Sequence, residues 1–301
     1  MCTPPTAGHD GTVTTPRTAL ITGASSGIGR ATALLLAAEG ASLVLLARGR
    51  PALETTAAEC RAAGAADVVV ETCDINDRAA VAAVVERAGA LDLVVHSATV
   101  MAYGDVEDLP ADVFDQVVDT AIKGTANVAR PVLATFRRQE RGDLVVVSSL
   151  LASITAPTMG AYATAKWGQL GLVRTLQQET RDVPGIRIAA VSPGGVNTPI
   201  YYQAATVLGN TGHPPPPVYS PRRVARTILD VAGSHRRLRQ SGFANPVIIA
   251  GYRLAPAVFD AAVGPLLRVF GMARDSVPPT EGNVFASVPD KNAEKGPWHD
   301  I

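Results

Sequence analysis

The sequence has no excess charge of either sign and no apolar run pure enough for a membrane span. Lys and Arg total 27 and Asp and Glu total 27 in 301 residues, so the formal net charge is zero. Proteins dedicated to nucleic acid usually carry a strong basic excess, so no nucleic-acid partner is expected. The uncharged stretch from Leu144 to Ala165 is too rich in Ser, Thr, Pro and Gly for a span, so no integral membrane segment is expected.

Cysteine is also scarce. Cys2, Cys60 and Cys73 are odd in number and widely spaced, and none belongs to a CxxC pair or a Cys/His cluster. We therefore expect neither a disulfide framework nor a metal site, and a cytoplasmic location fits. Residues 1–16 are rich in Thr, Pro and Gly and have no apolar run typical of a signal peptide, which predicts a flexible leader.

What the sequence does contain is a repeated alternation of short apolar segments with helical ones. Continuous apolar strands in such an alternation predict a parallel sheet covered on both faces, and right-handed crossovers make it doubly wound. We therefore predict an α/β fold built as a single domain over residues 17–252. Strands are expected near 18–22, 42–47, 67–72, 91–97, 143–149, 186–192 and 246–250, and helices near 29–40, 51–63, 77–89, 112–138, 161–181 and 222–233.

The segment 199–221 breaks this alternation. It holds no Asp, Glu, Lys or Arg and includes the run Pro214 to Pro217, which argues against a regular element. Because it leaves directly from a strand end, we interpret it as a lid over a ligand, with a plain surface loop as the alternative. Tyr201, Tyr202, Val207, Leu208 and Tyr219 would give that lid an apolar, ring-bearing character.

Residues 253–301 are expected to form a C-terminal extension. Its part from Leu254 to Met272 is apolar but contains Pro256, Gly264 and Pro265, so one unbroken helix is not expected there. This part could cap the fold, pair with another subunit or lie on a membrane surface, and packing within the protein is the default interpretation. The polar end from Asp275 to Ile301 is expected to wrap loosely or fray.

A small basic cluster precedes the extension. His235, Arg236, Arg237 and Arg239 could meet an anionic membrane or substrate. In a chain of zero net charge, a solvated loop is the preferred interpretation.

A glycine-rich turn, Thr22-Gly23-Ala24-Ser25-Ser26-Gly27-Ile28-Gly29, joins the first expected strand to a helix. Glycine lets the backbone approach a pyrophosphate closely, and the helix N-terminus beyond offers unpaired N–H groups and a positive dipole end. The spacing differs from G-x-G-x-x-G, and no Lys-Ser/Thr of a Walker A loop follows. The turn therefore favours a dinucleotide over ATP hydrolysis, and a purely structural turn is the alternative.

The residue at the end of the second strand bears on which dinucleotide is bound. An acidic residue there would favour NAD by accepting hydrogen bonds from the adenosine ribose. Arg48 instead offers a fork of donors suited to a 2′-phosphate, and Arg50 could assist. We therefore expect NADP(H) in preference to NAD(H), with a surface arginine of no special role as the alternative.

Ser149, Tyr162 and Lys166 form the sharpest chemical signal. Tyr162 and Lys166 are four residues apart on an expected helix and share one face, and Ser149 ends the preceding strand. A free tyrosine keeps its proton at neutral pH, but a neighbouring ammonium and a positively charged nicotinamide would favour the phenolate. Tyr162 could then donate or accept a proton while the serine hydroxyl holds the substrate oxygen.

With these pieces in order, the chain resembles the short-chain dehydrogenase/reductase family over about residues 17–200. The matching motifs are Thr22-Gly23-x-x-x-Gly27-x-Gly29, Asp74, Ser148-Ser149, Tyr162-x-x-x-Lys166 and Pro193-Gly194-x-x-x-Thr198. The resemblance implies a Rossmann fold in which Ser149 orients the carbonyl or alcohol, Tyr162 is the general acid or base, and Lys166 lowers its pKa and bonds the nicotinamide ribose.

The resemblance also implies a set of cofactor contacts. Asp74 and Ile75 would lie by the adenine, Val196 and Thr198 by the carboxamide, and the sequence after Pro193 would close over nicotinamide and substrate. The full expected cofactor-binding set is Gly23, Ser25, Ser26, Gly27, Ile28, Gly29, Arg48, Asp74, Ile75, Ser97, Ala98, Tyr162, Lys166, Pro193, Gly194, Val196 and Thr198.

Two positions depart from the family pattern. The usual Asn-Asn-Ala-Gly after the fourth strand is His96-Ser97-Ala98-Thr99, and Ala121 stands where the family has an asparagine that holds a water leading from the lysine to solvent. We hypothesise that His96 fills the space left at Ala121 as one coupled change. A structural histidine is preferred, and transfer of the proton by His96 is the alternative. Thr99 would narrow the wall beside the nicotinamide ribose.

The resulting expectation is an oxidoreductase that transfers a hydride between NADP(H) and a carbonyl or alcohol, with an apolar or ring-bearing substrate. A cofactor-binding scaffold with weak turnover, or a non-redox isomerase or dehydratase on the same fold, stays open as an alternative. The family commonly pairs through its two long helices, here about 112–138 and 161–181, so a homodimer or homotetramer is expected.

Overall fold

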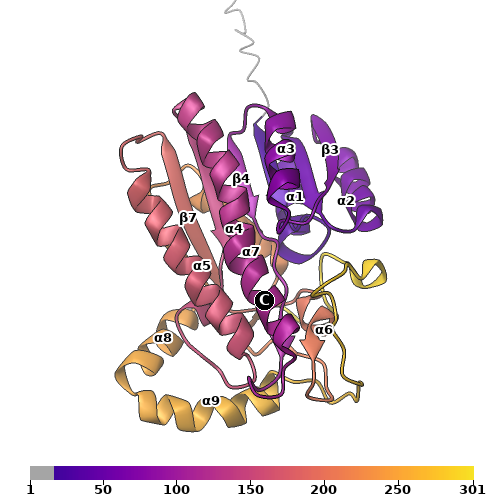
Figure 1. The fold of residues 1–301 in the computed structure, drawn as a ribbon, viewed down its shortest axis with the longest axis vertical. Coiled ribbons are helices and arrows are strands. Elements are labelled where there is room, and N and C mark those ends of the chain that lie inside the picture. Colours follow the sequence, from indigo (N-terminus) through magenta and orange to yellow (C-terminus); the bar gives the residue numbers. More distant parts are fainter. Residues whose placement is uncertain (1–16) are drawn as a thin grey trace, which may run out of the picture.

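The computed structural model describes residues 17–301, and the predicted leader lies outside them. Its centre is one seven-stranded sheet in which every pairing is parallel (Figure 1). The strands run in the order β11 (Leu238–Ser241), β7 (Ile186–Pro193), β6 (Gly142–Val147), β4 (Leu93–His96), β1 (Thr18–Thr22), β2 (Ser42–Ala47) and β3 (Asp67–Thr72). The predicted doubly wound sheet is confirmed.

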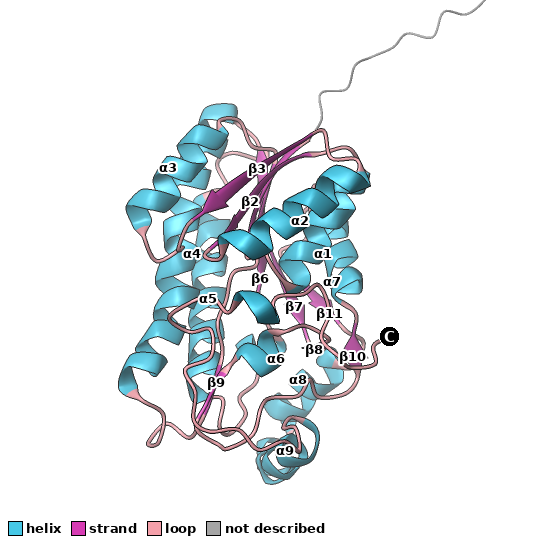
Figure 2. Ribbon diagram, turned by 90° about the vertical axis from the view of Figure 1, so that its right-hand side faces the viewer, coloured by secondary structure: helices cyan, strands magenta, loops and turns pink. Residues whose placement is uncertain are grey.

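Helices cover both faces of this sheet (Figure 2). One layer contains α1 (Gly27–Ala38), α2 (Arg50–Ala63) and α7 (Pro221–Val231), and the other contains α3 (Arg78–Ala88), α4 (Ala111–Gln139) and α5 (Gly160–Glu179). Within β1, Ala19 and Ile21 pack into the first layer and Leu20 into the second. Burial on both sides explains why the strands read as apolar runs without alternation.

The order of the strands places a crevice at their carboxyl ends. From β1 the sheet grows one way to β2 and β3 and the other way to β4, β6 and β7, so the connections after β1 and β4 diverge. In open α/β sheets, ligands bind at such a switch point. The turn after β1 and the segments after β4 and β6 all meet at this edge.

The segment 199–221 is more regular than its prolines suggested. It contains α6 (Ile200–Gln203), β9 (Ala205–Thr206) and β10 (Val218–Tyr219). β9 pairs with β5 (Ala102–Tyr103), and β10 pairs with β8 (Gly195–Val196). The expectation of no regular element was wrong because these two-residue strands are defined by partners distant in sequence, which local propensity does not report.

The expected strand near 246–250 is wrong, because these residues belong to α8 (Asn245–Leu254). Pro246 occupies the first helical turn, where its missing N–H costs nothing. The last strand of the sheet is β11, which contains Arg239 of the basic cluster that was expected as a loop. β11 is an edge strand with exposed polar side chains, so it lacks the apolar run that identified the others.

The apolar part of the extension forms a helix, α9 (Pro256–Phe270), which continues through Pro265. The expected break occurs at Pro256, which separates the end of α8 at Leu254 from the first turn of α9. The expectation was wrong for Gly264 and Pro265, because α9 continues through both. Among residues 17–301, no helix is both long enough and apolar enough to cross a membrane.

The end of the chain is hydrogen-bonded rather than frayed. It includes the 3-10 turn η2 (Pro289–Lys291) and lies along the lid. The Ile301 amide donates to the Val218 carbonyl over 2.9 Å, and the Asn283 amide donates to the Gln203 carbonyl over 2.8 Å. The expectation of a loose end was therefore wrong, because main-chain bonds of this kind are independent of side-chain identity and leave no sequence signal.

Candidate active site

A large cavity of about 690 Å³ lies at the carboxyl edge of the sheet. Its walls come from the turn after β1, the ends of β2, β4, β6 and β7, the lid, α9 and the C-terminal segment. Every residue expected at the site lines this cavity except Gly29. Arg50 also lies away from it, because its side chain is exposed and pairs with Glu54 at 2.9 Å.

Gly29 shapes the site from beneath. A Cβ atom at Gly29 would overlap the Gly23 carbonyl, and one at Gly23, where φ is +69°, would lie 2.8 Å from the Ala98 nitrogen. Gly27 has a φ of +54°, which side chains rarely adopt. The turn can take this tight form only with glycine, and the form directs the N-terminus of α1 at the cavity.

The chain that follows α9, called the tail below, covers this turn like a roof. The Gly27 amide and the Ser26 hydroxyl both donate to the Ala293 carbonyl, over 2.9 and 3.0 Å. Arg48 donates to the Val284 carbonyl over 2.9 Å and also to the Asn283 carbonyl. Burial lowers the pKa of Arg48, and the nearby Asp74 carboxylate opposes that shift. The tail therefore shares donors that the sequence assigned to cofactor phosphates.

The residues present fit a dinucleotide. Arg48 and Asp74 line the same cavity as Ser149 and Tyr162. The glycine turn leaves a helix N-terminus for a pyrophosphate. The Ser148 hydroxyl is buried without a hydrogen-bond partner in the described chain, and Ser148 lines the same cavity, so this hydroxyl is available to a polar ligand atom.

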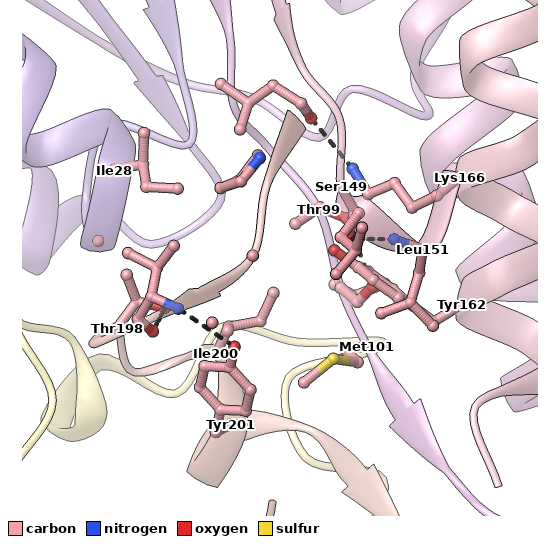
Figure 3. A pocket seen from close by; sticks show the side chains of 18 of the residues that line it. Ile28, Thr99, Met101, Ser149, Leu151, Tyr162, Lys166, Thr198, Ile200 and Tyr201 are labelled. Atoms are coloured by element: carbon pink, nitrogen blue, oxygen red, sulfur yellow. Dashed lines mark hydrogen bonds between the residues drawn. The ribbon is translucent and has the colours of Figure 1, made fainter. Parts of the chain in front are cut away.

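Ser149, Tyr162 and Lys166 meet on one wall, across the cavity from Ile28 and Thr198 (Figure 3). Ser149 caps η1 (Leu150–Ala152), where its hydroxyl accepts from the Leu151 amide over 3.1 Å. Tyr162 and Lys166 lie one turn apart on α5, and the Lys166 ammonium is 5.6 Å from the centre of the tyrosine ring. Lys166 is buried and donates to the Val147 carbonyl over 3.2 Å.

The electrostatics of the pair differ from expectation. Burial, and secondarily Tyr201, raises the pKa of Tyr162, and a hydrogen bond with Ser149 opposes this only in part. Burial also lowers the pKa of Lys166 to about 7, so the ammonium carries less charge than a surface lysine. The acidic phenol expected from the spacing is therefore not produced by the protein's own residues, because burial affects both groups more than they affect each other.

A buried chain of polar side chains begins at Lys166, and the sequence analysis missed most of it. Lys166 donates to the Gln169 Oε1 over 3.0 Å, and the Gln169 Nε2 donates to the Thr125 hydroxyl over 2.9 Å and to the Ala121 carbonyl over 3.4 Å. Gln169 thus supplies an amide beside Ala121, where the family has asparagine. Its position one turn beyond the lysine, at i+3, was the available signal.

His96 continues this chain toward the turn after β1. Its Nε2 lies 3.0 Å from the Thr125 hydroxyl, and its Nδ1 lies 2.9 Å from the Thr22 hydroxyl. Thr125 donates to the Ala121 carbonyl, so its oxygen is left to accept from the imidazole. Thr22 accepts from the Ser97 amide over 3.1 Å, so its hydrogen is left for Nδ1. These hydrogen bonds assign a neutral imidazole. Thr125 bonds to both His96 and the Ala121 carbonyl, so it links the two positions that depart from the family pattern.

This arrangement predicts an acid-labile fold. Burial and the charge of Lys166 lower the pKa of His96 to about 3, whereas an unfolded chain titrates near 6.5. Between these two pKa values the unfolded state binds more protons than the folded state. The contribution of His96 to the free energy of unfolding is therefore fully present above pH 6.5, and roughly 3–5 kcal/mol is lost as the pH drops through this window. Urea unfolding of His96→Asn across the window should show a flatter acid limb.

His235→Asn, at an exposed histidine, is the matched control and should keep the wild-type slope. Carboxylates titrate in the same window in all three proteins, so the comparison rests on the differences in slope. If the free energy of unfolding fell equally steeply with pH in the wild type and in His96→Asn, His96 would not be a cause of the acid lability.

The far half of the cavity is apolar and formed by the lid and α9. Tyr201 and Tyr219 line it, but the other lid residues suggested from sequence, Tyr202, Val207 and Leu208, do not. Trp298 of the tail packs edge-on against Tyr201 with ring centres 5.6 Å apart. The C-terminal segment therefore packs against residues 199–221. Further apolar lining comes from Met101, Tyr103, Leu150, Leu151, Ile154, Met159, Ile200, Phe259, Val263, Leu266, Leu267 and Phe270.

Comparison with known proteins gives a consistent result. The family model described as short chain dehydrogenase matches residues 17–206. A sepiapterin reductase from Chlorobaculum tepidum is 37% identical over 60% of this chain and 78% of the relative. An NADPH-dependent pterin aldehyde reductase from Arabidopsis thaliana is 32% identical over 64% of this chain and 81% of the relative.

A solved structure supports the same placement. The alcohol dehydrogenase from the archaeon Thermococcus sibiricus, complexed with 5-hydroxy-NADP, superposes with a TM-score of 0.65 at 27% identity, covering 75% of this chain and 95% of that one. The family model ends at residue 206, so most of the lid, α8, α9 and the tail lie beyond it.

Proposed function

Since this chain belongs to the short-chain dehydrogenase/reductase family, we propose that it is an NADP(H)-dependent reductase of apolar carbonyl compounds, with Tyr162 as the proton donor. An oxidoreductase acting on carbonyl or alcohol groups follows from the family and its reductase relatives. The observation that carries the finer proposal is that Ser149, Tyr162 and Lys166 line one wall of a cavity whose other end holds the glycine turn and Arg48.

A bound NADPH would supply the hydride for the carbonyl carbon, and side chains of this protein orient and protonate the carbonyl oxygen. Ser149 donates a hydrogen bond that orients the carbonyl, and the Tyr162 hydroxyl gives its proton to that oxygen as the alcohol forms. The raised pKa of Tyr162 keeps the proton in place at neutral pH, which suits reduction. The Lys166 ammonium then stabilises the phenolate that remains.

The cofactor contacts are proposed residue by residue. The turn from Gly23 to Gly29 would hold the pyrophosphate, with Gly29 acting through the fold of the turn. Asp74, Ile75, Ser97 and Ala98 would line the adenosine side, and Pro193, Gly194, Val196 and Thr198 the nicotinamide side. Arg48 would bind the 2′-phosphate with donors that the tail leaves available. An NADPH-dependent relative and the complex with 5-hydroxy-NADP support NADP(H).

Self-association is part of the proposal. The outer face of α5 is open, since a Cβ added at Gly171 would meet nothing within 4 Å and Trp167 on the same helix is 42% exposed. Together with α4, this face would form the interface of a homodimer or homotetramer.

The proposal is tested by following NADPH absorbance with a panel of ketones, aldehydes and imines that spans short, aromatic and long-chain members. Sepiapterin and a pterin aldehyde belong in the panel because of the named relatives. Turnover with apolar ketones is the expected result. NADPH binding without oxidation of it by any member would instead favour a cofactor-binding scaffold.

Gln169 is expected to act as a positioning residue for Lys166. With Lys166 titrating near pH 7, reduction should slow as the pH rises above that value, because the ammonium is lost. Gln169→Leu removes an acceptor from the ammonium and should move this limb to lower pH by about one unit. Gln169→Glu adds a negative charge and should move the limb to higher pH. The measurement is the pH profile of kcat.

If Gln169 had a purely structural role, its two substitutions would change the rate, but they would not move the alkaline fall of kcat in opposite directions. Gln177→Leu is the matched control, because Gln177 is also buried on α5 but bonds to the Ile188 carbonyl, away from Lys166. Its profile should keep the wild-type limb. Movement of both Gln169 variants in one direction would contradict the assigned role.

A further inference from the structure

The helices α8 and α9 project from the foot of the molecule, away from the layers around the sheet (Figures 1 and 2). None of the fifteen residues of α9 is buried. Seven of the thirteen large apolar side chains exposed in residues 17–301 fall within residues 243–270. They are Phe243, Val247, Leu254, Val258, Leu266, Val269 and Phe270. Apolar exposure is therefore concentrated on this helical hairpin, which is the usual mark of an interaction surface.

The apolar surface of α9 is wider than the stripe needed to close the cavity. Phe259, Val263, Leu267 and neighbours one turn apart face the cavity, whereas Val258 and Val269 lie outside its lining. Leu266 and Phe270 line the cavity and are also 53% and 45% exposed. The apolar surface thus continues from the cavity to the outside. A helix that is apolar around most of its circumference ordinarily lies against another apolar phase.

The charges on the hairpin are few and mostly positive. The two helices contain Arg253 and Arg268 against Asp260. None of these three side chains makes an ion pair within residues 17–301. Apolar side chains interspersed with unpaired arginines match an anionic lipid surface. A second copy docking by two-fold symmetry would instead place this surface, with its net positive charge, against an identical net positive surface.

We propose that the α8–α9 hairpin docks on an anionic lipid surface and admits a lipophilic carbonyl substrate from that surface to the cavity beside α9. The helices have 10 and 15 residues, which at 1.5 Å per residue is too short for a hydrocarbon core of about 30 Å. The hairpin therefore lies in the headgroup region without spanning the bilayer. The docking proposal depends only on the surface of the two helices. The second part of the proposal, that the substrate enters from the lipid surface (the substrate clause), depends on the proposed function.

Docking is tested by co-sedimentation of the full chain with vesicles. The two compositions are phosphatidylcholine alone and phosphatidylcholine mixed with phosphatidylglycerol in a two-to-one ratio. Because arginines are attracted to an anionic surface, the mixed vesicles should bind at least roughly tenfold more tightly. A variant with Leu254→Ser, Val258→Ser and Val269→Ser should lose binding by more than about tenfold. Arg253→Gln with Arg268→Gln should lose only the preference for anionic lipid.

Val69→Ser is the matched control, because Val69 is 42% exposed but lies on β3, distant in the sheet from the hairpin. It should bind vesicles as the wild type does. Three results would overturn the proposal: no binding to either vesicle, binding that the triple serine variant retains, or a dimer in analytical ultracentrifugation that the same substitutions dissociate while lipid is ignored. The last would assign the surface to a second copy.

The substrate clause has its own readout. In the presence of mixed vesicles, the triple serine variant should reduce a long-chain alkyl ketone more slowly than the wild type, while reduction of a short water-miscible ketone stays the same. Equal rates with the long-chain ketone would remove the substrate clause. No turnover of either ketone would contradict the proposed function but leave lipid docking to be decided by the vesicles.

Discussion

Tyr162→Phe is expected to lower kcat for carbonyl reduction by roughly 10²–10⁴-fold while leaving NADPH affinity close to that of the wild type. The substitution removes only the hydroxyl, and it keeps the ring that packs beside Lys166. The proton needed by the developing alkoxide would then have to come from water, which donates it less readily than a positioned phenol does. The measurement pairs NADPH absorbance under turnover with NADPH binding by calorimetry.

Tyr201→Phe is the matched control for this experiment. Tyr201 is a second phenol that lines the same cavity. Within the described chain, its hydroxyl makes one hydrogen bond, a long one in which it accepts from the Val196 amide over 3.4 Å. Losing such a bond should change kcat by less than about tenfold. Full turnover by Tyr162→Phe, or equal losses in the two variants, would show that Tyr162 is not the proton donor.

Arg48→Met is expected to raise the Kd for NADPH by roughly 10- to 100-fold and to change the Kd for NADH much less. A charge-assisted bond between a guanidinium and a phosphate contributes about 1.5–3 kcal/mol, and NADH lacks that phosphate. Arg48 also holds the tail at Asn283 and Val284, so the substitution loosens the roof over both dinucleotides. The ratio of the two dissociation constants separates phosphate recognition from the effect on the tail.

Arg50→Met tests whether any nearby positive charge would serve. Arg50 lies two residues away and pairs with Glu54 on the surface, so its loss should leave the ratio unchanged. An equal rise in Kd for NADPH and NADH in Arg48→Met would assign Arg48 to the tail alone. Preference for NADPH would then have to come from another donor.

The sheet and its helices were predictable because their signal is local. Five of the seven strands are buried on both faces, so each reads as an apolar run, and helical periodicity fills the intervals. The edge strand β3 is largely exposed but was recognised from Val68, Val69 and Val70. The seventh, β11, could not be recognised in this way because an edge strand with polar side chains resembles a loop. α8 was mistaken for a strand because a short apolar run fits a strand or a helix equally well.

The candidate site was predictable where motif spacing reports position. Strand ends and the first turn of a helix meet at the carboxyl edge of a parallel sheet, which is why Ser149, Tyr162 and the glycine turn line one cavity. The partners of those residues were not predictable. Gln169, Thr125 and His96 come from α5, α4 and β4 and are adjacent only because these elements pack together.

By itself, the sequence determined the doubly wound fold, the family and the identity of the residues at the cavity, because each depends on patterns within short segments. Tertiary structure alone decided how the titratable groups in and behind the cavity are shifted, since burial raises the pKa of Tyr162 and lowers those of Lys166 and His96. It also decided that the tail shares the donors of Arg48 and Gly27, and that α9 keeps an apolar surface in the open. These properties depend on which groups face one another, and desolvation and long-range contacts exist only once the chain is packed.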